Sequence, residues 1–163
     1  MRPVLVHGPG PKGNLQRLLG AIARDRALPL DSVRNRRSLV GVDNLASALL
    51  MAATAPLVAP GRTGGPPCHV YHLADDGVIS TRRLVEVLTE GLGVQPRLVS
   101  VPRWLAVGGA TLLGNGEMAR RLFEDLEVDD SDFRRDFGWK PSVGLEEGLR
   151  RMGEAFAREM QTR

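Results

Sequence analysis

The sequence predicts an α/β fold of short, mostly parallel strands packed with helices. Apolar runs at residues 3–6, 38–42, 70–74 and 96–101 are typical of short strands, and segments with apolar residues at helical spacing lie between and after them. Parallel strands need a crossover connection, so this alternation favours a parallel sheet. The 163 residues are enough for one domain, over residues 1–163, with a core of its own.

The first half of the chain divides into two strand–helix pairs. The run at 3–6 ends at Gly8-Pro9-Gly10, and Lys12-Gly13-Asn14 is expected to cap a helix that closes at residues 24–26. Leu28 to Leu30 is predicted to be extended, because Pro29 restricts the residue before it. After the run at 38–42, Asp43 or Asn44 is expected to cap a helix over 45–53. That helix is apolar nearly all round, which predicts that it is buried.

The second half is predicted to be mainly helical. Four prolines and three glycines at residues 55–67 indicate a surface loop. Ser80 is expected to cap a helix that ends at residues 91–93. Further helices are predicted at 104–113, within 118–126, at 132–137 behind a cap at 129–131, and at 145–160. The last of these has one apolar stripe, made of Leu145, Leu149, Met152 and Phe156.

Composition argues against several classes of protein. The formal charge is +3, but the basic residues are spread over several segments and aromatics are only 4% of residues, which argues against nucleic-acid binding. No apolar run approaches the roughly 20 residues needed to cross a membrane, and no leader segment is evident. Cys68 is the single cysteine, which fits a reducing cytoplasm. The histidines at 7, 69 and 72 lack the spacing of metal ligands.

A loop rich in backbone amides and a nearby arginine suit an anionic ligand. A helix that begins near Asn14 supplies partial positive charge, and Arg37 could hold a diphosphate through two parallel hydrogen bonds. Simpler interpretations stay open for each residue. Arg37 could be a solvated arginine of the run 34–37, Asn14 a helix cap, and Leu28 and Leu30 ordinary core residues.

Several segments together resemble a known family. They are Arg2-Pro3 with His7-Gly8-Pro9-Gly10, Arg37 seven positions before Asn44, and the closing stretches 129–131, 134–141 and 145–149. They resemble the C-terminal half of the NAD-dependent epimerase/dehydratase family, the extended short-chain dehydrogenases that act on nucleotide sugars. The resemblance implies a Rossmann-like fold of which this chain is the substrate-binding lobe, with the N-terminal NAD-binding part absent.

The resemblance also implies which residues contact ligands. Arg37 and Asn14 would lie at the diphosphate of a UDP-sugar, and Leu28 and Leu30 beside its base. Arg120 and Arg121 stand near the place where many members carry an Arg-x-x-Asp pair. The substrate-binding set is therefore Asn14, Leu15, Leu28, Leu30, Arg37, Asn44, Arg120 and Arg121. Any cofactor contact would fall to His7 and Gly8, and no residue is assigned to catalysis.

Two elements of the family's chemistry are missing from the sequence. There is no Gly-x-x-Gly-x-x-Gly turn for NAD or NADP, and no Tyr-x-x-x-Lys pair, since Tyr71 is followed four residues later by Asp75. We therefore expect a nucleotide-sugar-binding portion of a sugar epimerase, dehydratase or 4-keto reductase that binds no cofactor and is inert alone. A missing half or a homo-oligomer would complete it. The alternative is a non-catalytic module that binds nucleotide sugars or another protein.

Overall fold

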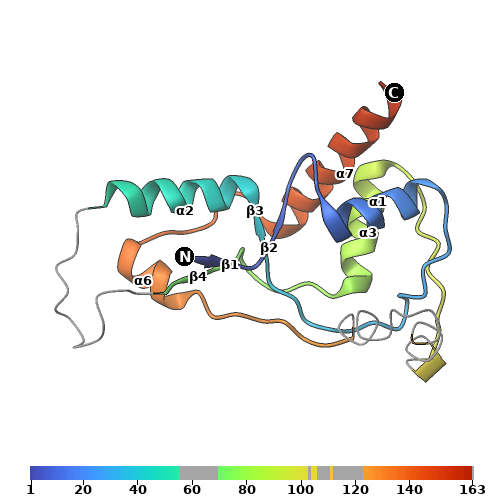
Figure 1. Ribbon diagram of the computed structural model, residues 1–163, viewed down its shortest axis with the longest axis horizontal. Coiled ribbons are helices and arrows are strands. Elements are labelled where there is room, and N and C mark those ends of the chain that lie inside the picture. The colour runs from blue at the N-terminus through green and yellow to red at the C-terminus, as the bar shows by residue number, and fades with distance from the viewer. Residues whose placement is uncertain (56–69, 103, 106–110, 112–122, 163) are drawn as a thin grey trace.

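The computed structural model describes residues 1–55, 70–102, 104–105, 111 and 123–162. Within these ranges the elements follow one another in the order β1 (Arg2–Pro3), β2 (Leu5–His7), α1 (Gly13–Ala23), β3 (Leu39–Gly41), α2 (Val42–Thr54), β4 (His72–Leu73), α3 (Thr81–Leu92), α6 (Ser131–Phe137) and α7 (Leu145–Gln161) (Figure 1). The loop predicted at 55–67 and the helices predicted at 104–113 and 118–126 lie wholly or largely outside the described residues.

The strands form two small parallel sheets, which confirms the predicted α/β class. β1 pairs with β4 in the register Arg2↔His72, and β2 pairs with β3 in the register Leu5↔Leu39. The strand predicted at 3–6 is thus divided between two partners. The strand predicted at 96–101 is wrong: it contributes an isolated bridge between Leu28 and Leu98. The opposite segment turns at Leu30, whose carbonyl accepts from Val33 N at 3.1 Å, and although Asp31 N still donates to the carbonyl of Val99 at 3.4 Å, no continuous strand pair forms.

The helix ends agree with the prediction where a capping side chain or a glycine determines them. Ser80 caps α3 as predicted, since its Oγ accepts from Arg83 N at 3.1 Å, and Gly93 ends α3 in the left-handed region with φ 70°. The predicted cap of α1 within residues 12–14 is confirmed, whereas the cap of α2 predicted at Asp43 or Asn44 is wrong. The N-cap of α1 is Lys12 and that of α2 is Gly41, neither with a side-chain bond. α2 follows β3 without a linker, so Asp43 and Asn44 fall inside its first turn.

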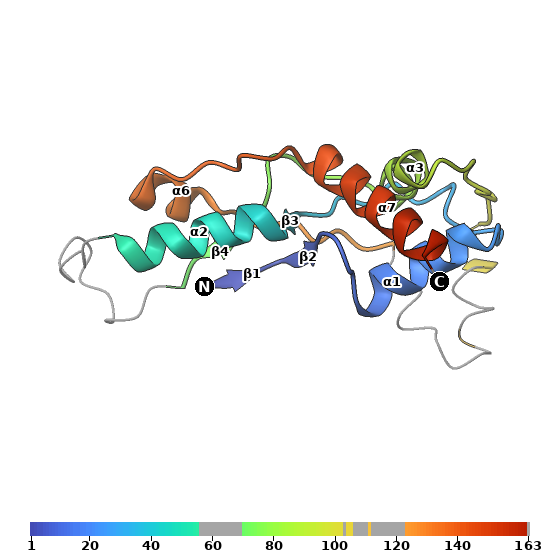
Figure 2. The same ribbon diagram turned by 90° about the horizontal axis from the view of Figure 1, so that it is seen from above.

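Two hydrophobic cores hold the described residues together. The larger lies between α1, α3 and α7 and contains Leu19, Val85 and Leu149. The smaller lies between α2, β4 and α6 and is built on Ala48, Leu73, Phe133 and Trp139. α7 also packs against β2 and β3, as does α2 (Figures 1 and 2). The parallel strands are therefore placed where the two cores meet.

Helix α2 departs from the prediction that it is buried. One of its faces, through Asn44 and Ala48, is buried. Another face is exposed although every residue on it is apolar: Val42, Ala46, Leu49, Leu50 and Ala53. Leu50 is 66% exposed. The prediction assumed that other elements pack against every side of α2, whereas the described residues pack against one side only.

Candidate functional site

The segment that carries Arg37 is fixed by backbone hydrogen bonds to chain segments on either side. Arg37 N donates to the carbonyl of Ile79, and Ile79 N donates back to that of Arg37, both at 3.0 Å. Leu126 N donates to the carbonyl of Arg36 at 2.8 Å. Arg37 therefore bridges the start of α3 and the chain that leads to α6. Its backbone is fixed even though it belongs to no strand.

Arg37 and Arg36 occupy opposite environments. Arg37 is part-buried, and burial lowers the pKa of its guanidinium while the charges of Asp125 and Glu124 act in the opposite direction. The group stays protonated at neutral pH, because the ordinary pKa of an arginine lies far above 7. Arg36 is exposed and donates to both carboxylate oxygens of Glu127, at 2.9 and 3.1 Å. A partly desolvated cation interacts more strongly with an anion than an exposed one does, so Arg37 is the stronger candidate.

The leucines of the predicted set are brought together, but as parts of the larger core. Leu15 and Leu30 are buried there, and Leu28 packs against them. Asn14 is exposed in the first turn of α1, one residue after the helix begins. Arg120 and Arg121 lie outside the described residues. Asn14 is thus exposed and Arg37 part-buried, while Leu15 and Leu30 belong to the larger core.

Asn44 lies at the centre of a buried polar network. Its Nδ2 donates to Asp75 Oδ1 and to the carbonyl of Val143, both at 2.8 Å. Its Oδ1 accepts from Ser142 N at 2.9 Å, from Ser142 Oγ at 3.2 Å and from Val143 N at 3.1 Å. Asn44 has no exposed surface, so it joins α2 to the turn before α7. Any effect of Asn44 on ligand binding would be indirect, through this connection between α2 and the turn before α7.

His7 extends the same network to the end of β2. Its Nε2 lies 3.0 Å from Asp75 Oδ2, which also accepts from Gly41 N at 2.9 Å. The other face of the ring lies against Gly148 of α7, where a β-carbon would come within 2.6 Å of it. Sequence reasoning missed Asp75, because an acid in a predicted turn is ordinarily exposed. Its position directly after a strand was the available signal.

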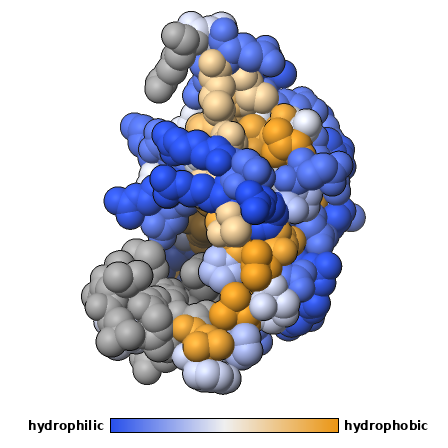
Figure 3. Space-filling model, turned by 90° about the vertical axis from the view of Figure 1, so that its right-hand side faces the viewer, coloured by the Kyte–Doolittle hydropathy of each residue, from blue (hydrophilic) through white to orange (hydrophobic). Residues whose placement is uncertain are grey.

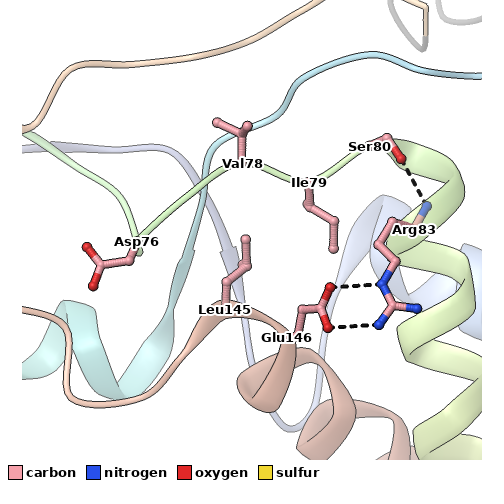
Figure 4. Close-up of a pocket in the computed structure, with 7 residues that line it drawn as sticks. All are labelled: Asp76, Val78, Ile79, Ser80, Arg83, Leu145 and Glu146. Atoms are coloured by element: carbon pink, nitrogen blue, oxygen red, sulfur yellow. Dashed lines mark hydrogen bonds and ion pairs between the residues drawn. The ribbon is translucent and has the colours of Figure 1, made fainter.

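A cavity among the described residues lies away from the predicted site. It has a volume of about 400 Å³ and lies between the chain before α3 and the first turns of α3 and α7, lined by Asp76, Val78, Ile79, Ser80, Arg83, Leu145 and Glu146 (Figure 4). A second hollow of about 310 Å³ lies between α1 and the end of α7. Figure 3 views that end of the molecule, where hydrophilic side chains surround a band of hydrophobic ones. Neither hollow includes a residue of the predicted set.

The ion pair beside the larger cavity predicts an acid-sensitive contact between α3 and α7. Arg83 donates to both carboxylate oxygens of Glu146 at 2.8 Å, which lowers the pKa of Glu146 below 4.5 (Figure 4). A depressed carboxylate pKa gives stability that is complete above the unfolded value and is lost as the pH falls through the folded value. Urea midpoints measured from pH 6 to pH 3 should therefore fall less steeply in Arg83→Gln than in the wild type. Equal slopes would contradict this. Both side chains are partly exposed, so the difference should be small and should shrink with salt.

The loop after β2 does not fit a dinucleotide cofactor. In a dinucleotide fold the first helix returns onto the parallel sheet, and the pyrophosphate sits at its N-terminus. Here α1 packs against α3, whereas α2 and α7 pack on β2 and β3. Gly8 is also closed off by Val42, whose Cγ1 would lie 2.5 Å from an added β-carbon. Among the described residues, moreover, no three His, Cys, Asp or Glu side chains gather as metal ligands would, and no helix is long and apolar enough to cross a membrane.

Comparisons with known proteins agree with this fold. No protein-family model matches the chain. The UDP-glucose 4-epimerase of Vibrio cholerae is 31% identical over 157 residues, a match that covers 96% of this chain and 45% of the relative. The chain is thus similar to part of the proteins of the NAD-dependent epimerase/dehydratase family. A 2-alkyl-3-oxoalkanoate reductase of Stenotrophomonas maltophilia is 29% identical over 172 residues, which cover 96% of this chain and 51% of that relative.

Solved structures of extended short-chain dehydrogenases share the fold. The UDP-glucose 4-epimerase of Thermotoga maritima, solved with UDP-glucose, superposes with a TM-score of 0.61 at 20% identity, over 98% of this chain and 45% of that one. The Bordetella bronchiseptica enzyme WbmG, solved with NAD and UDP, gives 0.64 at 13% identity, over 96% of this chain and 42% of its own. The chain thus spans about half the length of the relatives it matches.

Proposed function

We propose that this chain is the nucleotide-sugar-binding portion of an NAD(P)-dependent sugar epimerase, dehydratase or 4-keto reductase, and that its ligand is a UDP-sugar. The observation that carries the proposal is the 31% identity to a UDP-glucose 4-epimerase over almost the whole chain. Arg37 supports it, because a part-buried guanidinium with a fixed backbone suits a diphosphate. Asn14 lies open at the start of α1, where backbone amides attract anions.

We further propose that the chain is inert alone. A catalytic tyrosine of this family requires a neighbouring lysine that lowers its pKa. Tyr71 has the opposite environment: burial and a hydrogen bond to Asp136, at 3.0 Å, raise the pKa of its hydroxyl. Its ring packs edge-on against Phe133 in the smaller core. Tyr71 therefore stabilises the smaller core, and the acid–base chemistry would have to come from another part of the enzyme.

Thermal unfolding with ligands tests the proposed function. A ligand at a hundred times its dissociation constant should add about 2.7 kcal/mol of stability. For a chain of this size that corresponds to a rise in Tm of roughly 5–10 °C. We expect UDP and UDP-glucose to give such a rise and NAD to give none. Arg37→Ala should weaken UDP binding by about 1.5–3 kcal/mol, the usual worth of a hydrogen bond to a charged group.

The neighbouring arginine provides a matched control. Arg36→Ala removes the same charge one residue away, but from an exposed side chain that is paired with Glu127. It should leave the UDP-induced rise almost unchanged. Arg37→Lys keeps the charge without the planar fork and should recover only part of the affinity. An equal loss in Arg36→Ala and Arg37→Ala would mean that general charge, rather than a site at Arg37, attracts the ligand.

A second candidate function is reduction of an alkyl-chain ketone. Two relatives, 29% and 27% identical, are named 2-alkyl-3-oxoalkanoate reductases. The predicted base-contacting positions, Leu28 and Leu30, are aliphatic and give no aromatic ring for stacking. The same unfolding series distinguishes the two candidates. A 2-alkyl-3-oxoalkanoate that raises Tm where UDP does not would favour the reductase.

A further inference from the structure

Trp104 presents a large aromatic ring to solvent instead of to either core. Its exposed fraction is 72%, the highest of any large hydrophobic residue that the structure describes. Trp139, the only other tryptophan, is 2% exposed in the smaller core, and its Nε1 donates to Ser47 Oγ at 3.0 Å. Exposed aromatic rings are typical of contacts with ligands and partners, because they bury a large area with few rotatable bonds. The ring of Trp104 is therefore available to a bound molecule.

Hydrogen bonds tie the chain just before Trp104 to the segment that contains Leu28. Val99 N donates to the carbonyl of Leu28 at 2.8 Å, and Ser32 Oγ donates to the carbonyl of Val101 at 2.9 Å. Trp104 follows the last of these contacts by three residues. Figures 1 and 2 both show its short helical turn, in yellow, at the end of the molecule where α1 lies. Trp104 is thus held near the stretch that leads out of α1.

The segment from Leu28 to Arg37 is the one along which a nucleotide is expected to lie. The family resemblance puts the base at Leu28 and Leu30 and the diphosphate at Arg37. Leu30, however, is buried in the larger core, and Leu28 packs against that core. Both are aliphatic and lack the π-face on which a base stacks. A base in this region therefore needs a ring from another chain segment.

The groups on this segment and beside it match the two ends of a nucleotide diphosphate. The anionic end is bound best by a forked cation, which the part-buried Arg37 provides. The other end is a flat aromatic base, for which the exposed indole of Trp104 is a matching surface. An alkyl chain would pack as well on aliphatic side chains, so an exposed indole favours the nucleotide.

We propose that Trp104 stacks on the base of the bound nucleotide sugar and so supplies the ring that the segment at 28–30 lacks. The inference rests on the proposed function, since it requires a nucleotide whose diphosphate lies at Arg37. Stacking tolerates every base, because each one has a π-face. Trp104 therefore sets the preference for a nucleotide over a base-free diphosphate and leaves the choice of base to other residues.

Tryptophan fluorescence of the full chain reports on this contact. Because Trp139 is buried, a soluble quencher acts mainly on Trp104. We expect UDP to quench the emission of Trp104 in a saturable manner, since its base would lie on the indole. Inorganic pyrophosphate, which has no base, should bind without this quenching. In Trp104→Phe the exposed emission disappears, and the remaining emission of Trp139 should not respond to UDP.

Affinity measurements with the same two ligands separate the base from the diphosphate. Trp104→Ala should weaken UDP binding by about 5- to 100-fold, the usual effect of removing the ring under one stacked base, and should leave pyrophosphate binding unchanged. Trp104→Phe keeps a ring and should retain most of the UDP affinity. Arg37→Ala should weaken binding of both ligands. Because the indole is largely exposed, Trp104→Ala should keep its fold, which circular dichroism checks.

Leu105→Ala is the matched control. Leu105 is the next residue and is 48% exposed, so the variant removes neighbouring apolar surface without the ring and should bind UDP like the wild type. Wild-type UDP affinity in Trp104→Ala would overturn the inference and leave the proposed function intact. An equal loss of UDP and pyrophosphate binding in Trp104→Ala would also overturn it, because the residue would then act on the whole pocket. If UDP does not bind the wild-type chain, the proposed function and this inference both fail.

Discussion

Asn44→Ala is expected to lower the free energy of unfolding by about 3–5 kcal/mol, a large part of the roughly 5–15 kcal/mol available to a domain. The substitution removes five hydrogen bonds from a side chain with no exposed surface. It leaves the Asp75 carboxylate and the backbone groups of residues 142 and 143 without this partner. Each buried polar group left unsatisfied costs about 1–3 kcal/mol. Urea unfolding of the variant and the wild type measures the loss directly.

Two further variants test whether the loss of stability comes from the hydrogen-bond network of Asn44 or merely from a substitution in the first turn of α2. Asp43→Ala changes the preceding residue, which is exposed in the first turn, and should cost less than about 1 kcal/mol. Asn44→Asp keeps the shape but replaces the Nδ2 donor by an oxygen that faces Asp75 Oδ1 and the carbonyl of Val143. It should be destabilising at neutral pH and partly recover as the pH falls and the new carboxyl protonates. Wild-type stability in Asn44→Asp would show that these donor bonds contribute little.

Asn44 also shows where sequence reasoning reached its limit. The spacing from Arg37 to Asn44 was one of the features on which the resemblance to the family rested, and the fold agrees with that family. The same spacing does not tell which polar residue faces a ligand and which lies inside. Whether the side chain is buried depends on residues 142–143, almost a hundred positions away, which donate to it. Long-range contacts of this kind leave no local periodicity in the sequence.

Local signals predicted the local features well. Ser80 at the start of α3 and the glycines at the ends of α3 and α6 behave as their sequence positions suggest, because capping involves only a few neighbouring residues. The strand predicted at 96–101 failed because a strand needs a partner in regular register, and the opposite segment makes a turn at Leu30 that limits regular pairing to the bridge at Leu28. The apolar character of α2 was likewise visible, whereas its one-sided burial depends on which elements surround it.

Gly91→Ala is expected to destabilise the protein by about 2–4 kcal/mol, although alanine is the better helix former by about 1 kcal/mol. The helix ends within the predicted residues 91–93: Gly91 lies in the last turn of α3, and Gly93 is the residue that ends it. A β-carbon at Gly91 would come within 2.2 Å of the carbonyl oxygen of Arg150 and 3.1 Å of the Cα of Gly153. These are backbone atoms of α7, so a side-chain rotation cannot relieve the clash.

Gly20→Ala is the matched control, with an effect of opposite sign. Gly20 lies within α1, and its added β-carbon would meet only Nη1 of Arg24, at 3.2 Å, which is the mobile end of a long side chain. There the helix propensity should prevail and stabilise the protein by about 0.5–1 kcal/mol. Thermal and urea unfolding of both variants measure the contrast. If Gly91→Ala were neutral, α3 and α7 would not be in backbone contact. The same displacement of α7 would also loosen the contact between Gly148 and His7, so Gly91→Ala should disturb the end of β2 as well as the larger core.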